Sequence, residues 1–247
     1  RLIWFSQRCN PLPLSPTGNR MNNPSATTPS PPTPAPSNRT RIRRLPELAR
    51  YDRTALYDII DEAYVCHIAF NDGESTHCIP TACWRDGDFL YIHGSNGGRL
   101  TKMMLGGRQV SIAITHVDGL VLAKSAFNHS MNYRSCVIYG EFELVEGREN
   151  KLAAMDIFMD KIALGRKHEA RAGNDKELAA TSVLRISLAE AAAKISCKTE
   201  PEDKEEDLDL PVWAGILPLR TLRTEPIQAK HSTSVVPEYV AHWQDKI

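Results

Sequence analysis

The sequence predicts a mainly β protein of the α+β class, namely a six- to seven-stranded antiparallel split β-barrel with peripheral helices. Alternating runs of apolar and polar residues follow one another closely, with short turns rich in Asn, Asp and Gly between them. Strands joined by such short turns pair in the antiparallel direction, because a parallel pair needs a long crossover connection. Few segments have helical periodicity, so the helices are expected on the outside of the barrel.

The first 46 residues differ in composition from the rest of the chain. Ten of the 16 prolines lie at or before Pro46, and residues 22–37 are entirely Asn, Pro, Ser, Thr and Ala. Such a segment buries too little apolar surface to offset the entropy lost on ordering. We therefore predict a disordered leader over residues 1–46, a folded domain over residues 47–227 and a tail over residues 228–247.

Charge and hydropathy exclude several classes of protein. Lys and Arg number 30, as do Asp and Glu, so a general nucleic-acid-binding surface is not expected. The sequence contains no run of about 18 apolar residues, so no membrane span is predicted. The apolar patch at residues 2–5 is too short for a signal peptide. The six cysteines lack paired spacing, which favours buried free thiols and a cytoplasmic location.

The folded domain is expected to begin with a short helix from Thr54, its N-cap residue, to Asp61. Three strands follow at residues 63–70, 78–84 and 89–93. The turns between them, Asn-Asp-Gly-Glu and Arg-Asp-Gly-Asp, are typical of hairpin connections. These strands are therefore predicted to form a β-meander and not a βαβ unit.

A helix over residues 99–105 is followed by two apolar runs that flank Val117-Asp118-Gly119. The Asp-Gly pair between these runs, residues 110–116 and 120–126, predicts a second hairpin.

The last predicted elements lead into an irregular C-terminal part. A long strand over residues 135–146 precedes an amphipathic helix over residues 149–162, and the final strand covers residues 182–188. After the acidic run at residues 200–209, the chain is expected to cross the surface and dock through Trp213.

The most informative stretch for function is the junction at residues 89–102, where a strand runs into a glycine-rich turn and a helix that opens with Arg99. Glycines let a ligand approach the backbone, free amides point out of a helix start, and a guanidinium suits phosphate. This pattern predicts a site for a phosphorylated cofactor. The alternative is a turn that only reverses the chain. Neither the dinucleotide-binding pattern nor the P-loop pattern fits the glycines.

A second constellation surrounds Arg134, which enters an otherwise apolar strand. A buried arginine needs a partner, and either a nearby carboxylate or a ligand anion would serve. If Arg134 lies beside the glycine-rich turn, one phosphate would satisfy both features.

Two other kinds of site are not expected. The pairs Cys66-His67 and His77-Cys78 lie on predicted strands, where neighbouring side chains point to opposite faces, so neither pair chelates a metal. The nucleophile elbow Gly-x-Ser-x-Gly of serine hydrolases is missing from the sequence.

Three motifs together resemble the pyridoxamine 5'-phosphate oxidase-like flavoproteins, and in particular the flavin-nucleotide-binding branch related to nitroimidazole-resistance reductases. The motifs are residues 91–95 with Arg99-Leu100, residues 125–135 and residues 213–219. The resemblance covers about residues 44–227. It implies a split-barrel homodimer that binds FMN at the subunit interface, and it makes residues 47–227 the FMN-binding domain.

The resemblance also assigns positions to the cofactor site. Arg99 would clamp the phosphate with help from Lys102, and His93 would be the catalytic residue near the flavin. The alternative for His93 is a strand-end histidine that only hydrogen-bonds the turn. The complete set of cofactor-binding positions is Pro80, Thr81, Ile92, His93, Gly94, Ser95, Arg99, Leu100, Lys102, Arg134 and Ser135.

The resulting functional prediction is an FMN-dependent oxidoreductase that passes electrons from NADH, NADPH or another donor to a small organic acceptor. The true oxidases carry an Arg- and His-containing C-terminal segment that binds pyridoxal phosphate, and residues 213–219 contain neither. Efficient oxidation of pyridoxamine 5'-phosphate is therefore not expected. The alternatives are a non-catalytic flavin carrier or sensor and a heme-binding relative.

Overall fold

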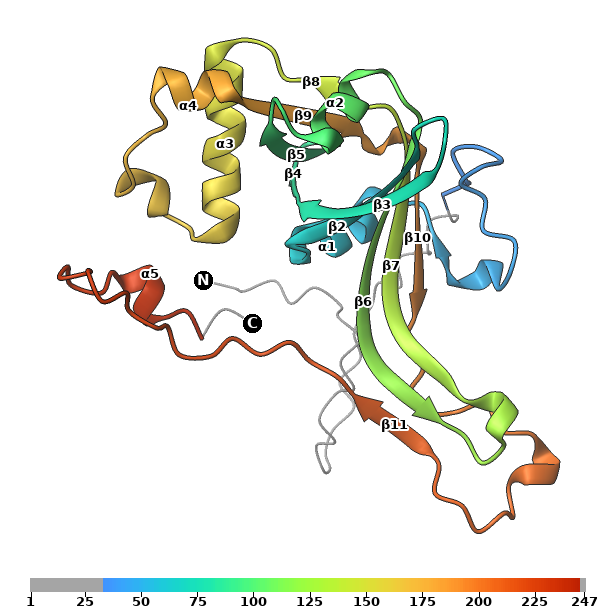
Figure 1. Ribbon diagram of the computed structural model, residues 1–247. Helices are drawn as coiled ribbons and strands as arrows, with labels where there is room; N and C mark the ends of the chain where they lie inside the picture. The colour runs from blue at the N-terminus through green and yellow to red at the C-terminus, as the bar shows by residue number, and fades with distance from the viewer. Residues whose placement is uncertain (1–32, 245–247) are drawn as a thin grey trace, which may run out of the picture.

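A computed structural model describes residues 33–244 (Figure 1). The helices are α1 (Arg53–Glu62), α2 (Arg99–Leu105), α3 (Arg148–Ile162), α4 (Asp175–Ala180) and α5 (Glu238–Ala241). The strands are β1 (Ala49–Arg50), β2 (Val65–Asn71), β3 (Thr76–Ala82), β4 (Trp84–Asp86), β5 (Phe89–Ser95), β6 (Val110–Leu122), β7 (Ser130–Gly140), β8 (Glu143–Leu144), β9 (Thr181–Ser187), β10 (Ala191–Ser196) and β11 (Gly215–Pro218).

Two antiparallel sheets form the molecule. The larger has seven strands in the order β1-β10-β7-β6-β2-β3, with β11 pairing with β6 outside this path. The smaller has four strands in the order β4-β5-β9-β8. This arrangement confirms the predicted antiparallel split barrel of the α+β class, with the helices at its periphery (Figure 1).

The predicted hairpin at Val117-Asp118-Gly119 is wrong. Residues 110–122 form one continuous strand, β6, which pairs with β7 from Val110–Gly140 to Val121–Ser130. A register shift between Val117 and Gly119 marks a β-bulge, which absorbs the Asp-Gly pair without reversing the chain. The reversal lies further on, at the short 3₁₀ helix Ala126–Asn128.

Other boundaries also differ from the prediction. Asp52, and not Thr54, caps α1, because Asp52 Oδ1 accepts a hydrogen bond of 2.9 Å from the Ala55 N–H. The predicted strand over residues 135–146 is two strands in different sheets, β7 and β8. Strand β10 was not predicted, because its Ala-Ala-Ala-Lys-Ile-Ser sequence lacks β-branched alternation.

Most of the predicted leader, residues 1–32, lies outside the described residues. The remainder contacts the folded body: Ser37 Oγ donates a hydrogen bond of 2.6 Å to Glu190, and Thr40 is buried. The boundaries at residues 46/47 and 227/228 stay predictions.

The C-terminal segment docks through its backbone and not through Trp213. Strand β11 pairs with β6 from Gly215–Leu122 to Pro218–Gly119, whereas 63% of Trp213 is exposed. Together with β6 and β7 beyond the bulge, β11 forms an arm that projects from the barrel, hereafter the arm (Figure 1).

The main core lies between the two sheets and α1, and contains Leu56, Ile68, Ile92, Ile112 and Ile138. A second apolar cluster, of Trp84, Tyr91, Ala154 and Val183, lies between the smaller sheet and α3. Of the described cysteines, Cys66, Cys83 and Cys136 are buried and free and Cys78 is exposed and free. The expectation of buried free thiols is thus confirmed for Cys66, Cys83 and Cys136, whereas Cys78 is exposed and Cys197 is disulfide-bonded.

No described helix is both long enough and apolar enough to span a membrane.

Candidate functional site

Helix α2 spans residues 99–105 and opens at Arg99 as the sequence predicted, whereas β5 continues to Ser95, two residues beyond its predicted end. A Cβ added to Gly94 would lie 2.7 Å from Thr101 Oγ1, and one added to Gly98 would lie 3.1 Å from the Ser95 carbonyl oxygen. Both glycines therefore let the helix start approach the strand end closely. Gly98 is the N-cap and supplies no side-chain hydrogen bond, so no side chain caps the start of α2.

Arg99 extends from this junction toward the turn between β2 and β3. Its Nη2 atom lies 2.6 Å from Asp72 Oδ2 and 2.7 Å from His77 Nε2. The Arg99 side chain is nevertheless 57% exposed. An exposed guanidinium with one carboxylate partner retains donors for a further anion.

Of the other residues predicted to bind the phosphate, some face the junction with their side chains and others with their main chain only. Lys102 is exposed, follows Arg99 by one turn, and makes no ion pair among the described residues. The Leu100 side chain packs on the main core, so only its main chain faces the junction. Ser95 Oγ accepts a hydrogen bond of 3.3 Å from the Gly97 N–H and thereby holds the turn.

Strand β3 places Pro80 and Thr81 on opposite faces of the larger sheet. Thr81 is opposite buried Cys66 and faces the core side, whereas Pro80 is opposite His67 and faces outward. The Ile92 side chain is buried in the main core, so its side chain is not available to a ligand. Strands β3 and β5 are in contact, which brings Pro80's strand to the junction.

Arg134 is not part of a phosphate site. Its guanidinium donates two hydrogen bonds to Asp118, of 2.8 and 2.9 Å, and two to Glu62, of 2.6 and 3.0 Å. The two carboxylates raise the pKa of Arg134, and only 13% of its side chain is exposed. The sequence was compatible with either a carboxylate or a ligand anion as the partner of Arg134. The structure shows that two carboxylates, and not a ligand anion, pair with its guanidinium.

Ser135 lies on the other face of β7 from Arg134. Its Oγ donates a hydrogen bond of 3.3 Å to the Lys194 carbonyl oxygen on β10. The hydroxyl oxygen keeps acceptor capacity toward the outer face of the larger sheet.

His93 lies on the side of β5 that faces α3. Its ring packs 4.9 Å from the Phe158 ring and 5.8 Å from the Trp84 ring, measured between centroids. His93 Nδ1 is buried and has no hydrogen-bond partner in the described structure, and the same holds for Trp84 Nε1. Burial lowers the pKa of His93, which favours the neutral imidazole. The alternative prediction, a histidine that hydrogen-bonds the turn, is not what the contacts show.

The structure thus brings together Gly94, Ser95, Arg99 and Lys102 at one junction, and separates them from Arg134. Sequence reasoning missed Asp72 and His77, which meet Arg99 from the β2–β3 turn. The sequence Asn71-Asp72-Gly73 predicts a turn. The carboxylate of Asp72 was the one signal in that turn that could have indicated a partner for Arg99.

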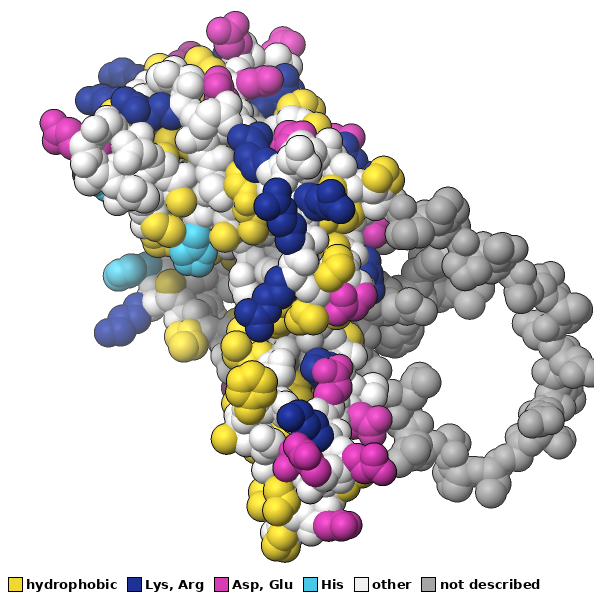
Figure 2. All heavy atoms as spheres, turned by 90° about the vertical axis from the view of Figure 1, so that its right-hand side faces the viewer, with side chains coloured by type: hydrophobic (Ala, Val, Ile, Leu, Met, Phe, Trp, Pro, Cys, Tyr) yellow, Lys and Arg dark blue, Asp and Glu magenta, His cyan; other side chains and the backbone are white. Residues whose placement is uncertain are grey.

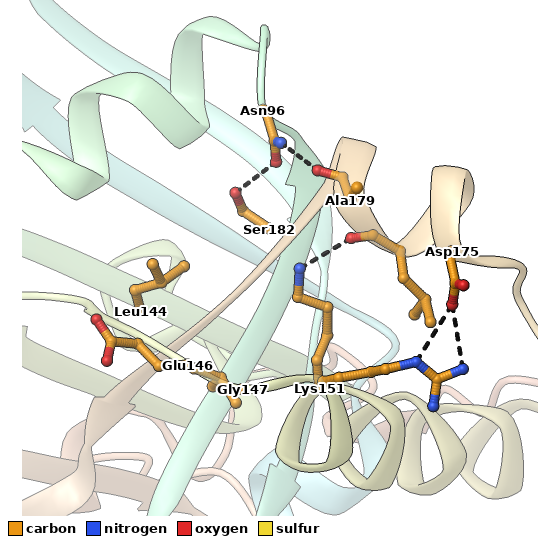
Figure 3. A pocket seen from close by; sticks show the side chains of 11 residues that line it. Asn96, Leu144, Glu146, Gly147, Lys151, Asp175, Ala179 and Ser182 are labelled. Atoms are coloured by element: carbon orange, nitrogen blue, oxygen red, sulfur yellow. Dashed lines mark hydrogen bonds and ion pairs between the residues drawn. The ribbon is translucent and has the colours of Figure 1, made fainter.

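A hollow of about 510 Å³ lies elsewhere, lined by residues of β8, α3, α4 and β9 and by Asn96 of the turn after β5 (Figure 3). Asn96 bonds Ala179 and Ser182, Lys151 bonds the Leu178 carbonyl oxygen at 2.8 Å, and Arg148 pairs with Asp175. These polar groups fasten α4 to the body, so the hollow has few donors left for a ligand. Within the described residues no group of His, Cys, Asp and Glu side chains could hold a metal ion.

An antiparallel split barrel with an arginine-bearing strand-to-helix junction defines a class of small cofactor-binding proteins. Residues 52–195 match the family model described as pyridoxamine 5'-phosphate oxidase. This match covers more than half of the chain, which therefore belongs to the pyridoxamine 5'-phosphate oxidase-like family. No curated protein matches the chain.

Several solved structures are similar to this chain, two of them at 30% identity or more. The flavocytochrome Anf3 from Azotobacter vinelandii is 34% identical, with a TM-score of 0.80, over 84% of this chain and 97% of that one. An FAD and heme binding protein from Mycobacterium smegmatis is 30% identical, with a TM-score of 0.76, over 80% and 97%. A candidate 5-nitroimidazole antibiotic resistance protein from Bacteroides thetaiotaomicron is 22% identical, with a TM-score of 0.51, over 60% and 86%. That last likeness supports the fold alone.

Proposed function

We propose that this protein is a flavin-binding redox protein whose β5–α2 junction binds the flavin phosphate through Arg99. The observation that carries the proposal is the half-exposed guanidinium of Arg99, held 2.6 Å from Asp72 at a junction opened by Gly94 and Gly98. The names of the two relatives at 34% and 30% identity, a flavocytochrome and an FAD and heme binding protein, support a flavin.

The donor set at the junction fits a phosphate. Arg99 supplies fork-shaped donors, exposed Lys102 adds a second positive charge on the same side of α2, and the start of the helix has no side-chain cap. The outer face of the larger sheet, with Pro80 and Ser135, is the surface proposed for the flavin ring. Arg134 is excluded from this set because two carboxylates occupy it.

A bound flavin would supply the electron-transfer chemistry, and the protein's own groups bind, orient and shield. Arg99 and Lys102 fix the phosphate, which determines where the ring lies. His93 faces α3, on the other side of the smaller sheet from Pro80 and Ser135, so its proposed role of orienting the acceptor requires the flavin site of a second copy in a homodimer. Because burial lowers its pKa, His93 acts as a neutral hydrogen-bonding group at neutral pH and is a weak proton donor there.

The flavin is proposed to be FMN, the electron donor NADH or NADPH, and the acceptor a small organic molecule. Three measurements test this proposal. Titration with FMN and with FAD identifies the nucleotide. The loss of flavin absorbance on adding NADH or NADPH under nitrogen distinguishes a reductase from a flavin carrier or sensor.

Arg99→Ala should weaken FMN binding about tenfold to a hundredfold, because it removes a charge-assisted phosphate contact. Unchanged affinity would remove Arg99 from the site.

Heme binding is the second candidate function, and His93 is the observation that favours it. Its Nδ1 is buried without a partner, its neutral form is favoured, and two aromatic rings flank it. A neutral imidazole without a hydrogen-bond partner at Nδ1, packed beside aromatic rings, would suit the coordination of a heme iron. Both relatives at or above 30% identity carry heme or cytochrome in their names.

The heme candidate has its own test. The purified protein supplied with hemin should show a sharp heme absorption band, and His93→Ala should lose that band while it keeps its FMN affinity. An unchanged band in His93→Ala would exclude His93 as the ligand.

A homodimer is proposed as the working assembly. Figure 2 shows hydrophobic side chains among acidic ones over the lower end of the molecule, where the arm lies. Its exposed apolar residues include Leu120, Met131, Trp213 and Leu217. Exposed apolar area of this kind favours association with a second copy. Light scattering at micromolar concentration tests it, and a monomer with FMN bound would contradict it.

A further inference from the structure

Both oxygens of the Asp72 carboxylate have close polar partners. Its Oδ1 atom accepts hydrogen bonds of 3.0 and 2.8 Å from the N–H groups of Glu74 and Ser75. Its Oδ2 atom lies 2.7 Å from His77 Nε2 and 2.6 Å from Arg99 Nη2. These donors lower the pKa of Asp72 and keep it ionised at neutral pH. Asp72 is thus an anchored anion whose position the β2–β3 turn sets.

Arg99 is held at one edge and open at the other. Its hydrogen bonds to the described residues all involve Nη2, whereas Nε and Nη1 make none there. The side chain is 57% exposed, against 17% for Asp72. An arginine side chain loses much rotamer freedom when it binds an anion, so a prior anchor reduces the cost of binding.

We propose that Asp72 is a positioning residue that orients Arg99 for the phosphate of a flavin, and that it thereby sets a preference for phosphorylated over unphosphorylated flavin. This inference rests on the proposed flavin site. Asp72 would act through Arg99 and not by contacting the phosphate itself. Its like charge would also repel a phosphate, but the Arg99 side chain is 57% exposed to solvent, so that repulsion is screened. Orientation therefore outweighs repulsion.

The test compares FMN with riboflavin, which has the same ring and no phosphate. Asp72→Asn keeps an oxygen for the turn N–H groups and removes the charge. FMN affinity should fall about tenfold and riboflavin affinity should stay unchanged, because only the phosphate contact depends on Arg99. Asp61→Asn is the matched control: it removes the carboxylate of another aspartate–arginine pair, with Arg85 at 2.5 Å, and should leave both affinities unchanged.

Each outcome decides the matter. Equal loss for FMN and riboflavin would mean that Asp72 has only a structural role. Unchanged FMN binding would mean that Asp72 does not position Arg99, and tighter FMN binding would mean that Asp72 competes with the phosphate for Arg99. Any of these results overturns the role proposed for Asp72. The proposed phosphate site still stands in that case if Arg99→Ala binds FMN more weakly than the wild type. If Arg99→Ala binds FMN normally, the phosphate site itself fails, and the role of Asp72 fails with it. Should Asp72→Asn not fold, Asp72→Ser retains a turn acceptor and takes its place.

Discussion

Gly94 and Thr101 approach each other so closely that a Cβ on Gly94 would lie 2.7 Å from Thr101 Oγ1. Thr101 is only 3% exposed, so it has little room to move. Gly94→Ala should therefore lower the free energy of unfolding by about 1 to 3 kcal/mol through overpacking. Urea denaturation measures the change.

Gly97→Ala is the control for this substitution. A Cβ on Gly97 would have Ser95 Oγ at 3.9 Å as its nearest neighbour, an ordinary contact. We expect a change within about 0.5 kcal/mol there. Equal destabilisation by the two substitutions would mean that the close approach at Gly94 does not constrain the junction.

The junction could be predicted from the sequence because its signals are local. Alternation over β5, glycines in the turn and helical residues from Arg99 onward lie within residues 89–105. The partners of Arg99 and Arg134 could not be predicted in this way. Asp72 is 27 residues from Arg99, and Glu62 is 72 residues from Arg134, so only the fold decides which carboxylate meets which guanidinium.

The errors in the fold have the same physical origin. Asp118-Gly119 has the composition of a hairpin turn, but pairing with β7 and β11 on both sides keeps β6 extended through a bulge. Tertiary pairing also overrides the helical propensity of the alanines in β10, which lies between β1 and β7.

Arg134 should matter for stability and not for flavin binding. Arg134→Ala removes the guanidinium that pairs with both Glu62 and Asp118, whose side chain is only 17% exposed. We expect a loss of about 3 kcal/mol in the free energy of unfolding. Urea denaturation tests the loss, and the ratio of FMN to riboflavin affinity should not change.

Arg148→Ala gives the comparison, because Arg148 and Asp175 form a pair whose side chains are 62% and 87% exposed. Such an exposed pair contributes about 0 to 1 kcal/mol. A selective fall in FMN affinity in Arg134→Ala would return Arg134 to the phosphate site.

His93 should make the cofactor-free protein less stable as the pH falls. Burial lowers its pKa below the value of 6.5 expected in an unfolded chain, so the unfolded state binds more protons. Stability from this group is therefore complete above that pH and decreases below it, by at most about 1.4 kcal/mol per pH unit. His93→Phe keeps an aromatic ring and should show a smaller decrease between pH 7.5 and 5.5, roughly the range in which a histidine changes charge. Urea midpoints that change equally with pH in both proteins would contradict this.

The reaction that gives the family its name is the oxidation of pyridoxamine 5'-phosphate. In the resemblance, the oxidases hold their phosphorylated substrate with a C-terminal segment containing Arg and His, whereas residues 213–219 here contain neither and include the edge strand β11. Selective binding of pyridoxamine 5'-phosphate needs several placed polar partners, so its turnover should be negligible. Quinones and nitroaromatics need mainly stacking on a flavin, so we expect them to be reduced slowly, and more slowly still by His93→Ala with FMN occupancy kept. Stopped-flow absorbance with each acceptor measures these rates. Rapid oxidation of pyridoxamine 5'-phosphate with release of hydrogen peroxide would show that a phosphate-binding segment exists elsewhere in the chain.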